Sequence, residues 1–284
     1  GIELSGVSGK GSACLVKAPT NLREALSETG LILVVLPAFA HAYVAEQIAP
    51  LLKKDDRIVL SPGSTGGALE FREILSKHGA PKGVKVGETN TLIYACRISG
   101  PGHVKILGVK EFLGVAALPA TDTQALLEPL KEIYPQTQAV ENVLSTGLNN
   151  MNPIFHVFPT LTNLGWLEAT KGNFRFYHDG ITPSVAKLVE AVDRERMMLC
   201  QSLGISTLSG MEWQKKFYGA KGSVLPEILQ SNRAYEEIQA PSSKETRLIT
   251  EDVPMGLVPM AEIAEIVGVP TPFMDSAILL ASEI

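Results

Sequence analysis

A row of polar side chains runs through the otherwise apolar segment Leu148–Leu167. Its members follow one another at steps of three and four residues: Asn149, Asn152, His156, Thr160 and Asn163. On a helix these positions share one face. Buried amides and imidazoles need hydrogen-bond partners, because each unpaired group costs about 1–3 kcal/mol. The pattern favours a helix whose polar row lines a cleft. The alternative is a solvated row on a helix broken at Pro153 and Pro159.

His156 is the member of this row best suited to proton transfer. Its aromatic and β-branched neighbours, Phe155, Val157 and Phe158, favour the neutral imidazole, which is the form that a general base needs. A satisfied core histidine is the alternative reading. The remaining histidines are expected at the surface: His41, His78, His103 and His178.

Charged residues also occur in an apolar, proline-punctuated segment near the C-terminus, Thr246–Pro259. Buried charges there need partners. Arg247 is suited to hold a substrate carboxylate through two parallel hydrogen bonds, and Asp252 is suited to orient an imidazole. A surface salt bridge among Arg247, Glu251 and Asp252 is the alternative.

Composition limits the class of protein. The chain has 284 residues, which predicts about two domains, and its net charge of -5 argues against a nucleic-acid partner. Its three cysteines, Cys14, Cys96 and Cys200, are widely spaced and predict neither a disulfide framework nor a metal site. No apolar run reaches the ~18 residues of a membrane span. We therefore expect a soluble, cytoplasmic protein without a membrane partner.

The first half of the chain alternates between strand and helix patterns. Leu31–Leu36 and Ile58–Leu60 are continuous apolar runs, typical of strands buried on both faces. Helical patterns follow each run, which predicts an α/β fold with a parallel sheet. The glycine-rich segment Ser61–Gly67 has no Walker lysine, and a plain turn or a phosphate contact explains it equally well.

Helical patterns replace the strand signals near residue 140. Within them, Thr182 and Pro183 begin a long helix that extends to about Gly204. The charged run Asp193–Arg196 on this helix is expected to form a solvated or interfacial face. We place the domain boundary at 139, with domains at 1–139 and 140–284.

Several blocks of the sequence resemble the opine dehydrogenase family, which includes octopine and nopaline dehydrogenases. The most specific blocks are PGSTGGALEF at 62–71, GITPS at 180–184 and EDVPMGLVP at 251–259. The resemblance covers nearly the whole chain. It implies a Rossmann-like domain that binds NAD or NADP, followed by an all-helical substrate domain.

The resemblance also implies roles for individual residues. His156 matches the acid–base, Asp252 its partner, and Arg247 the group that receives a carboxylate. The polar row adds three substrate-binding candidates: Asn149, Asn152 and Thr160. The residues assigned to the cofactor are Pro37, Ala38, Thr65 and Glu88.

The implied reaction is reversible. An amino acid or amine condenses with a 2-oxo acid, and hydride reduces the imine to a secondary amine. The family begins with a strand, a G-x-G-x-x-G turn and a helix, which this sequence lacks, so we expect the chain as written to bind a dinucleotide poorly. Two alternatives are a dehydrogenase of a simple hydroxy acid and a non-catalytic homologue. A homodimer is possible.

Overall fold

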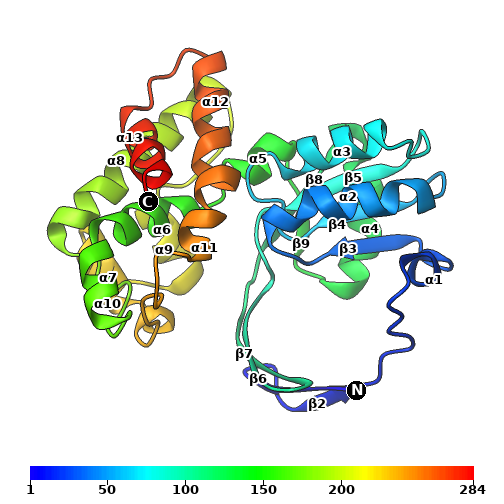
Figure 1. The fold of residues 1–284 in the computed structure, drawn as a ribbon, viewed down its shortest axis with the longest axis horizontal. Helices are drawn as coiled ribbons and strands as arrows, with labels where there is room; N and C mark the ends of the chain where they lie inside the picture. The colour runs from blue at the N-terminus through cyan, green and yellow to red at the C-terminus, as the bar shows by residue number, and fades with distance from the viewer. The chain divides into compact units, whose positions relative to one another are not determined.

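The computed structural model describes residues 1–284, and the chain divides into two units, Gly1–Gly147 and Leu148–Ile284 (Figure 1). None of the helices has both the length and the apolar composition that a membrane crossing requires.

A five-stranded sheet forms the centre of the first unit, in the order β3-β4-β5-β8-β9. Its strands are β3 (Leu31–Val34), β4 (Arg57–Leu60), β5 (Lys85–Thr89), β8 (Leu113–Leu118) and β9 (Thr137–Ala139). β3, β4 and β5 are mutually parallel, which the apolar runs at 31–36 and 58–60 predicted for β3 and β4. β8 pairs antiparallel with β5, whereas the sequence predicted a parallel sheet.

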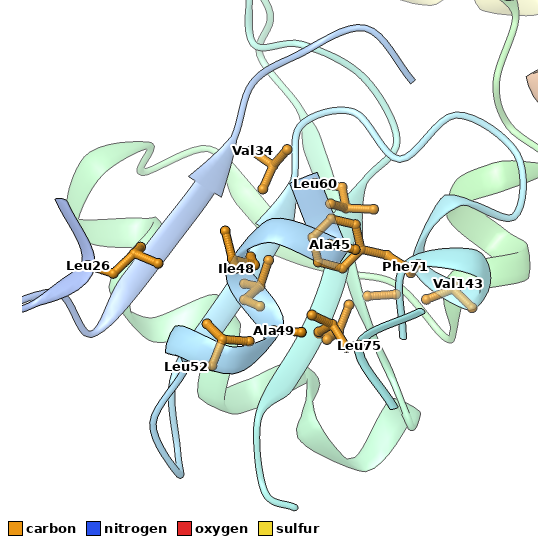
Figure 2. Close-up of a cluster of buried hydrophobic side chains, with 14 residues drawn as sticks. Leu26, Val34, Ala45, Ile48, Ala49, Leu52, Leu60, Phe71, Leu75 and Val143 are labelled. Carbon is orange, nitrogen blue, oxygen red and sulfur yellow. The ribbon is translucent and has the colours of Figure 1, made fainter. Parts of the chain in front are cut away.

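Helices cover both faces of this sheet. They are α1 (Leu22–Leu26), α2 (His41–Ile48), α3 (Gly67–Lys77), α4 (Thr123–Ile133) and α5 (Val143–Gly147). Leu60 of β4 packs in one apolar cluster with Phe71 of α3 (Figure 2), and Ile58 belongs to the same cluster. Val59 packs in another cluster with Leu126 of α4. This alternation along β4 explains why an uninterrupted apolar run is needed in a strand covered on both sides.

A second sheet in this unit has four strands, in the order β2-β1-β7-β6. They are β1 (Ile2–Gly6), β2 (Gly11–Ala13), β6 (Tyr94–Gly100) and β7 (His103–Val109). β6 and β7 form an antiparallel hairpin, and β1 runs parallel to β7. Gly102 in the hairpin turn has a φ of 72°, a conformation that glycine adopts at no steric cost.

The second unit is helical, as the sequence predicts. Its helices are α6 (Asn152–Thr162), α7 (Leu164–Thr170), α8 (Pro183–Ser202), α9 (Gly210–Tyr218), α10 (Leu225–Ser231), α11 (Arg247–Thr250), α12 (Val258–Ile266) and α13 (Pro272–Ser282). A π-helical turn, Val253–Leu257, links α11 to α12. Thr182 caps α8 as expected, accepting a hydrogen bond from the Val185 backbone N–H. Pro153 lies in the first turn of α6, and the helix continues through Pro159.

The charged run on α8 is largely buried, contrary to the solvated or interfacial face expected from the sequence. The Arg196 side chain is fully buried and donates hydrogen bonds to Asp193 Oδ1 and to the Leu148 carbonyl. Glu195 accepts hydrogen bonds from the backbone N–H groups of Phe273 and Met274 in the first turn of α13. These charges are buried because each has several partners, which periodicity alone does not reveal.

Removing the Arg196 side chain should strongly destabilise the second unit. Arg196→Ala leaves the Asp193 carboxylate buried without its cation, so we expect the free energy of unfolding to fall by about 3–5 kcal/mol. Arg194→Ala is the matched control, since Arg194 is exposed on the same helix. Denaturant unfolding measures both variants. Equal effects of the two substitutions would contradict a buried role for Arg196.

Two of the histidines expected at the surface are buried. His41 at the start of α2 is fully buried, with its ring edge-on to Phe71, and His178 is 9% exposed. His78 and His103 are exposed as expected. Tertiary packing overrides the polar sequence context at His41.

Candidate active site

His156 lies on α6 and meets Asp252 from a distant part of the same unit. Its Nδ1 is 2.6 Å from Asp252 Oδ2. The side chains are 16% and 11% exposed, respectively, so water screens this pair only weakly. An ionised carboxylate is only an acceptor, so Nδ1 carries the hydrogen and Nε2 is the nitrogen left to gain or lose a proton. The structure therefore brings together the two residues that the sequence assigned to catalysis.

The local structure around Asp252 determines where its carboxylate points. Asp252 immediately precedes the π-helical turn Val253–Leu257, and the Leu257 backbone N–H donates to the Asp252 carbonyl. π-Helical turns are rare and are often found at functional sites. The short helix α11, just before Asp252, packs against α6. This packing places the carboxylate beside the imidazole.

Tyr177 occupies the other side of the His156 ring, and sequence reasoning did not identify it. Its hydroxyl oxygen is 2.9 Å from His156 Nε2. The neighbouring Phe176 ring stands edge-on to the imidazole, with centroids 6.3 Å apart. The only sequence signal was position, because Tyr177 lies three residues before the GITPS block at 180–184 that carries the family resemblance.

The other members of the polar row mostly bind the protein itself. The Thr160 hydroxyl is fully buried and donates to the His156 carbonyl at 2.7 Å. Asn149 Oδ1 accepts from the Thr207 hydroxyl at 2.8 Å. Asn163 Nδ2 donates to the Gly180 carbonyl at 2.9 Å. Asn152 is exposed, one turn before His156. Three members of the row thus have hydrogen-bond partners within the protein, and substrate binding by Asn149, Asn152 and Thr160 stays a prediction.

Arg247 is not paired with Asp252. Its side chain is 66% exposed, and Nη1 lies 3.6 Å from Glu251 Oε2. Part of the surface salt bridge considered from the sequence is thus present, while Asp252 turns to His156 instead. An exposed guanidinium with one distant carboxylate partner keeps donors available for a second anion.

Three of the cofactor candidates lie in the first unit at the carboxyl ends of parallel strands. Pro37 and Ala38 follow β3, and Thr65 lies in the glycine loop between β4 and α3. The Thr65 hydroxyl donates to the Gly147 carbonyl at 3.0 Å. Nucleotides bind at this end of open α/β sheets.

The surface after β3 gives a partial fit to a nicotinamide cofactor. Val35, Leu36 and Phe39 expose apolar side chains beside the Pro37 turn, which suits contact with a flat ring. No G-x-G-x-x-G segment occurs in the sequence. The residues present thus fit a ring of the cofactor and provide no counterpart of the pyrophosphate loop.

Glu88 supports the glycine loop from beneath. It is fully buried, and its Oε2 accepts from the Ala68 backbone N–H at 2.8 Å while Oε1 accepts from the Thr146 hydroxyl at 2.5 Å. A Cβ at Gly63 would lie 2.2 Å from Oε2, so only glycine fits there. The carboxyl group thus holds the loop and the first turn of α3. A role of Glu88 in cofactor binding stays a prediction.

Glu88 should make the stability of the first unit depend on pH. Burial raises its pKa from 4.5 to about 7, although the bonds from Thr146 and Ala68 act to lower it. A carboxyl group whose pKa is higher in the folded than in the unfolded chain stabilises the fold below the pKa of the unfolded chain. This contribution is lost as the pH rises through the pKa of the folded chain. In the parent chain, the free energy of unfolding should therefore fall as the pH rises from about 4.5 to about 7. Glu88→Gln should remove this fall.

Denaturant titrations at several pH values measure this difference between the variant and the parent chain. Glutamine can retain both contacts: its amide oxygen can accept from the Ala68 N–H, and its NH₂ can donate to the Thr146 oxygen. The Thr146 hydroxyl can then donate to the Val143 carbonyl, 2.9 Å away. His41 titrates in the opposite sense, since burial lowers its pKa, but it is present in both proteins. The same pH slope in both proteins would contradict the assignment.

Comparison with known proteins gives one family. Residues 139–284 match the family model described as NAD/NADP octopine/nopaline dehydrogenase, alpha-helical domain. An opine dehydrogenase from Arthrobacter sp. (strain 1C) is 41% identical over 92% of this chain and 72% of its own length. Vitopine synthase from Allorhizobium ampelinum is 27% identical over 93% of this chain and 72% of its own length.

Solved structures confirm the fold. The structure of octopine dehydrogenase with NADH and L-arginine has a TM-score of 0.79 at 22% identity, covering 99% of this chain and 76% of that one. The structure of apo yersinopine dehydrogenase has a TM-score of 0.80 at 14% identity, covering 99% and 78%. Both support the α/β unit followed by a helical unit.

The family model and the Arthrobacter relative confirm the resemblance seen in the sequence blocks. The chain belongs to the opine dehydrogenase family, and it is an NAD(P)-dependent oxidoreductase that joins an amino acid or amine to a 2-oxo acid by reductive condensation.

Proposed function

We propose that His156 is the general acid–base of this opine dehydrogenase and that Asp252 orients it. The observation that carries the proposal is the 2.6 Å contact between His156 Nδ1 and Asp252 Oδ2. The contact fixes the tautomer and stabilises the imidazolium that forms when Nε2 takes up a proton.

The proton steps follow from this arrangement. His156 Nε2 first takes a proton from the substrate ammonium group, so that the free amine nitrogen can attack the carbonyl carbon of the 2-oxo acid. The imidazolium gives this proton to the carbonyl oxygen as the C–N bond forms. The imidazole then takes a second proton from nitrogen and gives it to the hydroxyl group, which leaves as water. Bound NADH or NADPH supplies the hydride that reduces the resulting imine carbon.

Arg247 is the proposed partner of the 2-oxo acid carboxylate. Its exposed guanidinium, 3.6 Å from Glu251, can exchange this contact for a bidentate one with a substrate. Asn152, exposed one turn before His156, is a second proposed substrate contact. We assign cofactor binding to 1–139, through Pro37, Ala38 and Thr65, and substrate binding to 140–284.

A panel assay tests the reaction. The chain is incubated with NADH or NADPH, one amino acid or amine, and pyruvate or 2-oxoglutarate. We expect nicotinamide oxidation only when both organic substrates are present, with one secondary amine formed per hydride consumed. Oxidation with the 2-oxo acid alone would show that no amine is required and would favour direct reduction to a hydroxy acid.

Cytoplasmic location and a homodimer remain proposals from the sequence. The former rests on composition, and sedimentation of the purified chain measures the latter directly.

A further inference from the structure

Both ring nitrogens of His156 have partners within the second unit. Asp252 holds Nδ1, and the Tyr177 hydroxyl lies 2.9 Å from Nε2. The acid–base role proposed for His156 requires only the contact with Asp252. The second lies at the nitrogen that would exchange protons, so it bears on the same reaction.

Tyr177 is held firmly by the residues around it. It is 6% exposed and stacks on Tyr235, with centroids 4.0 Å apart and an interplanar angle of 18°. Phe176 stands edge-on to it, with centroids 5.0 Å apart. The Tyr235 hydroxyl in turn accepts from Gln214 Nε2 at 3.2 Å, and Gln214 Oε1 accepts from Asn232 at 2.8 Å. A phenol fixed by this buried network has little freedom to turn away from the imidazole.

We propose that Tyr177 is a positioning residue, an inference that rests on the proposed role of His156. Together with Asp252, Tyr177 fixes the plane of the imidazole and its Nδ1–H tautomer. Two hydrogen bonds at opposite nitrogens determine the orientation of a planar ring, whereas one leaves it free to tilt. In the neutral ring the phenol O–H can donate to the Nε2 lone pair, which matches a tautomer with hydrogen on Nδ1.

The phenol can remain in place when His156 gains a proton. A hydroxyl both donates and accepts, so Tyr177 donates to Nε2 in the neutral ring and accepts from Nε2–H in the charged ring. The Nε2 proton is then shared between the phenol oxygen and the substrate oxygen in a three-centre hydrogen bond, an arrangement common in proteins. The imidazole thus keeps one orientation through a cycle of proton uptake and release.

Tyr177→Phe tests this role, because it removes the hydroxyl and keeps the stacked ring. We expect kcat to fall about tenfold or more with KM changed by less than about threefold, since ring orientation affects proton transfer more than binding. The matched control is Tyr218→Phe, the same change in the same aromatic cluster. The Tyr218 ring centroid lies 5.3 Å from that of Tyr235, and its hydroxyl hydrogen-bonds Tyr235. The control therefore removes one bond from the network around Tyr177 without touching His156 in any ring pair or hydrogen bond described. Thermal unfolding of both variants measures the structural cost of losing a hydroxyl.

A spectroscopic readout separates this inference from the proposed function. The chain has five histidines, and the His156 signals in a ¹⁵N-histidine spectrum are assigned by their absence in His156→Asn. We expect the parent chain to show Nδ1 protonated and Nε2 unprotonated, and Tyr177→Phe to move the Nε2 signal downfield as its hydrogen bond is lost. Tyr218→Phe should leave both signals in place.

Each outcome decides the point. An unchanged Nε2 signal in Tyr177→Phe, or a loss of kcat matched by Tyr218→Phe, would overturn the positioning role. If the Nε2 signal moves but His156→Ala retains full activity, the contact is real and the acid–base role of His156 is the part that fails.

Discussion

Replacement of His156 by alanine lowers kcat by about 10²- to 10⁴-fold, the range that a positioned acid–base contributes. The fold is expected to survive, because the side chain is partly exposed and its loss leaves Asp252 without one hydrogen bond, at a cost of about 1–3 kcal/mol. Steady-state kinetics and denaturant unfolding measure the two effects separately.

His78→Ala is the matched control for this experiment. His78 is exposed at the C-terminal end of α3, and its removal should change neither kcat nor stability. A His156→Ala protein that loses its fold together with its activity would make His156 a core histidine, the alternative that the sequence left open.

Substitution of Asp252 by asparagine has the second large effect. The amide is nearly isosteric, but its NH₂ can donate to Nδ1 and so favour the tautomer that carries hydrogen on Nε2. It also removes the charge that stabilises the imidazolium. We expect kcat to fall by about 10²-fold or more. Asp275→Asn, at an exposed position on α13, is the control. A kcat within about threefold of the parent would show that Asp252 is not needed to orient His156.

Continuous patterns made much of the fold predictable. The apolar runs of β3 and β4 and the Thr182 cap of α8 are local signals, and the structure confirms each, with β3 ending at Val34 instead of Leu36. The antiparallel direction of β8 was not predictable in this way. Strand direction depends on how the chain returns across the sheet, and the intervening β6–β7 hairpin provides that return.

The site was less accessible to sequence reasoning than the fold. Helical periodicity singled out His156, but family resemblance was needed to link it with Asp252, because nothing local relates residues so far apart. Tyr177 was missed for the same reason. The burial of Glu88 and Arg196 likewise depends on hydrogen-bond partners from distant segments, Thr146 and Leu148, which local sequence context does not reveal.

A double-mutant cycle on kcat/KM tests most directly whether His156 and Asp252 form one catalytic unit. The parent chain, His156→Ala, Asp252→Asn and the double variant are assayed under one set of conditions. Two groups acting as a unit give strongly non-additive losses. We predict that the double variant is about as slow as His156→Ala alone. Losses that multiply would show that the two residues act independently and would contradict the account.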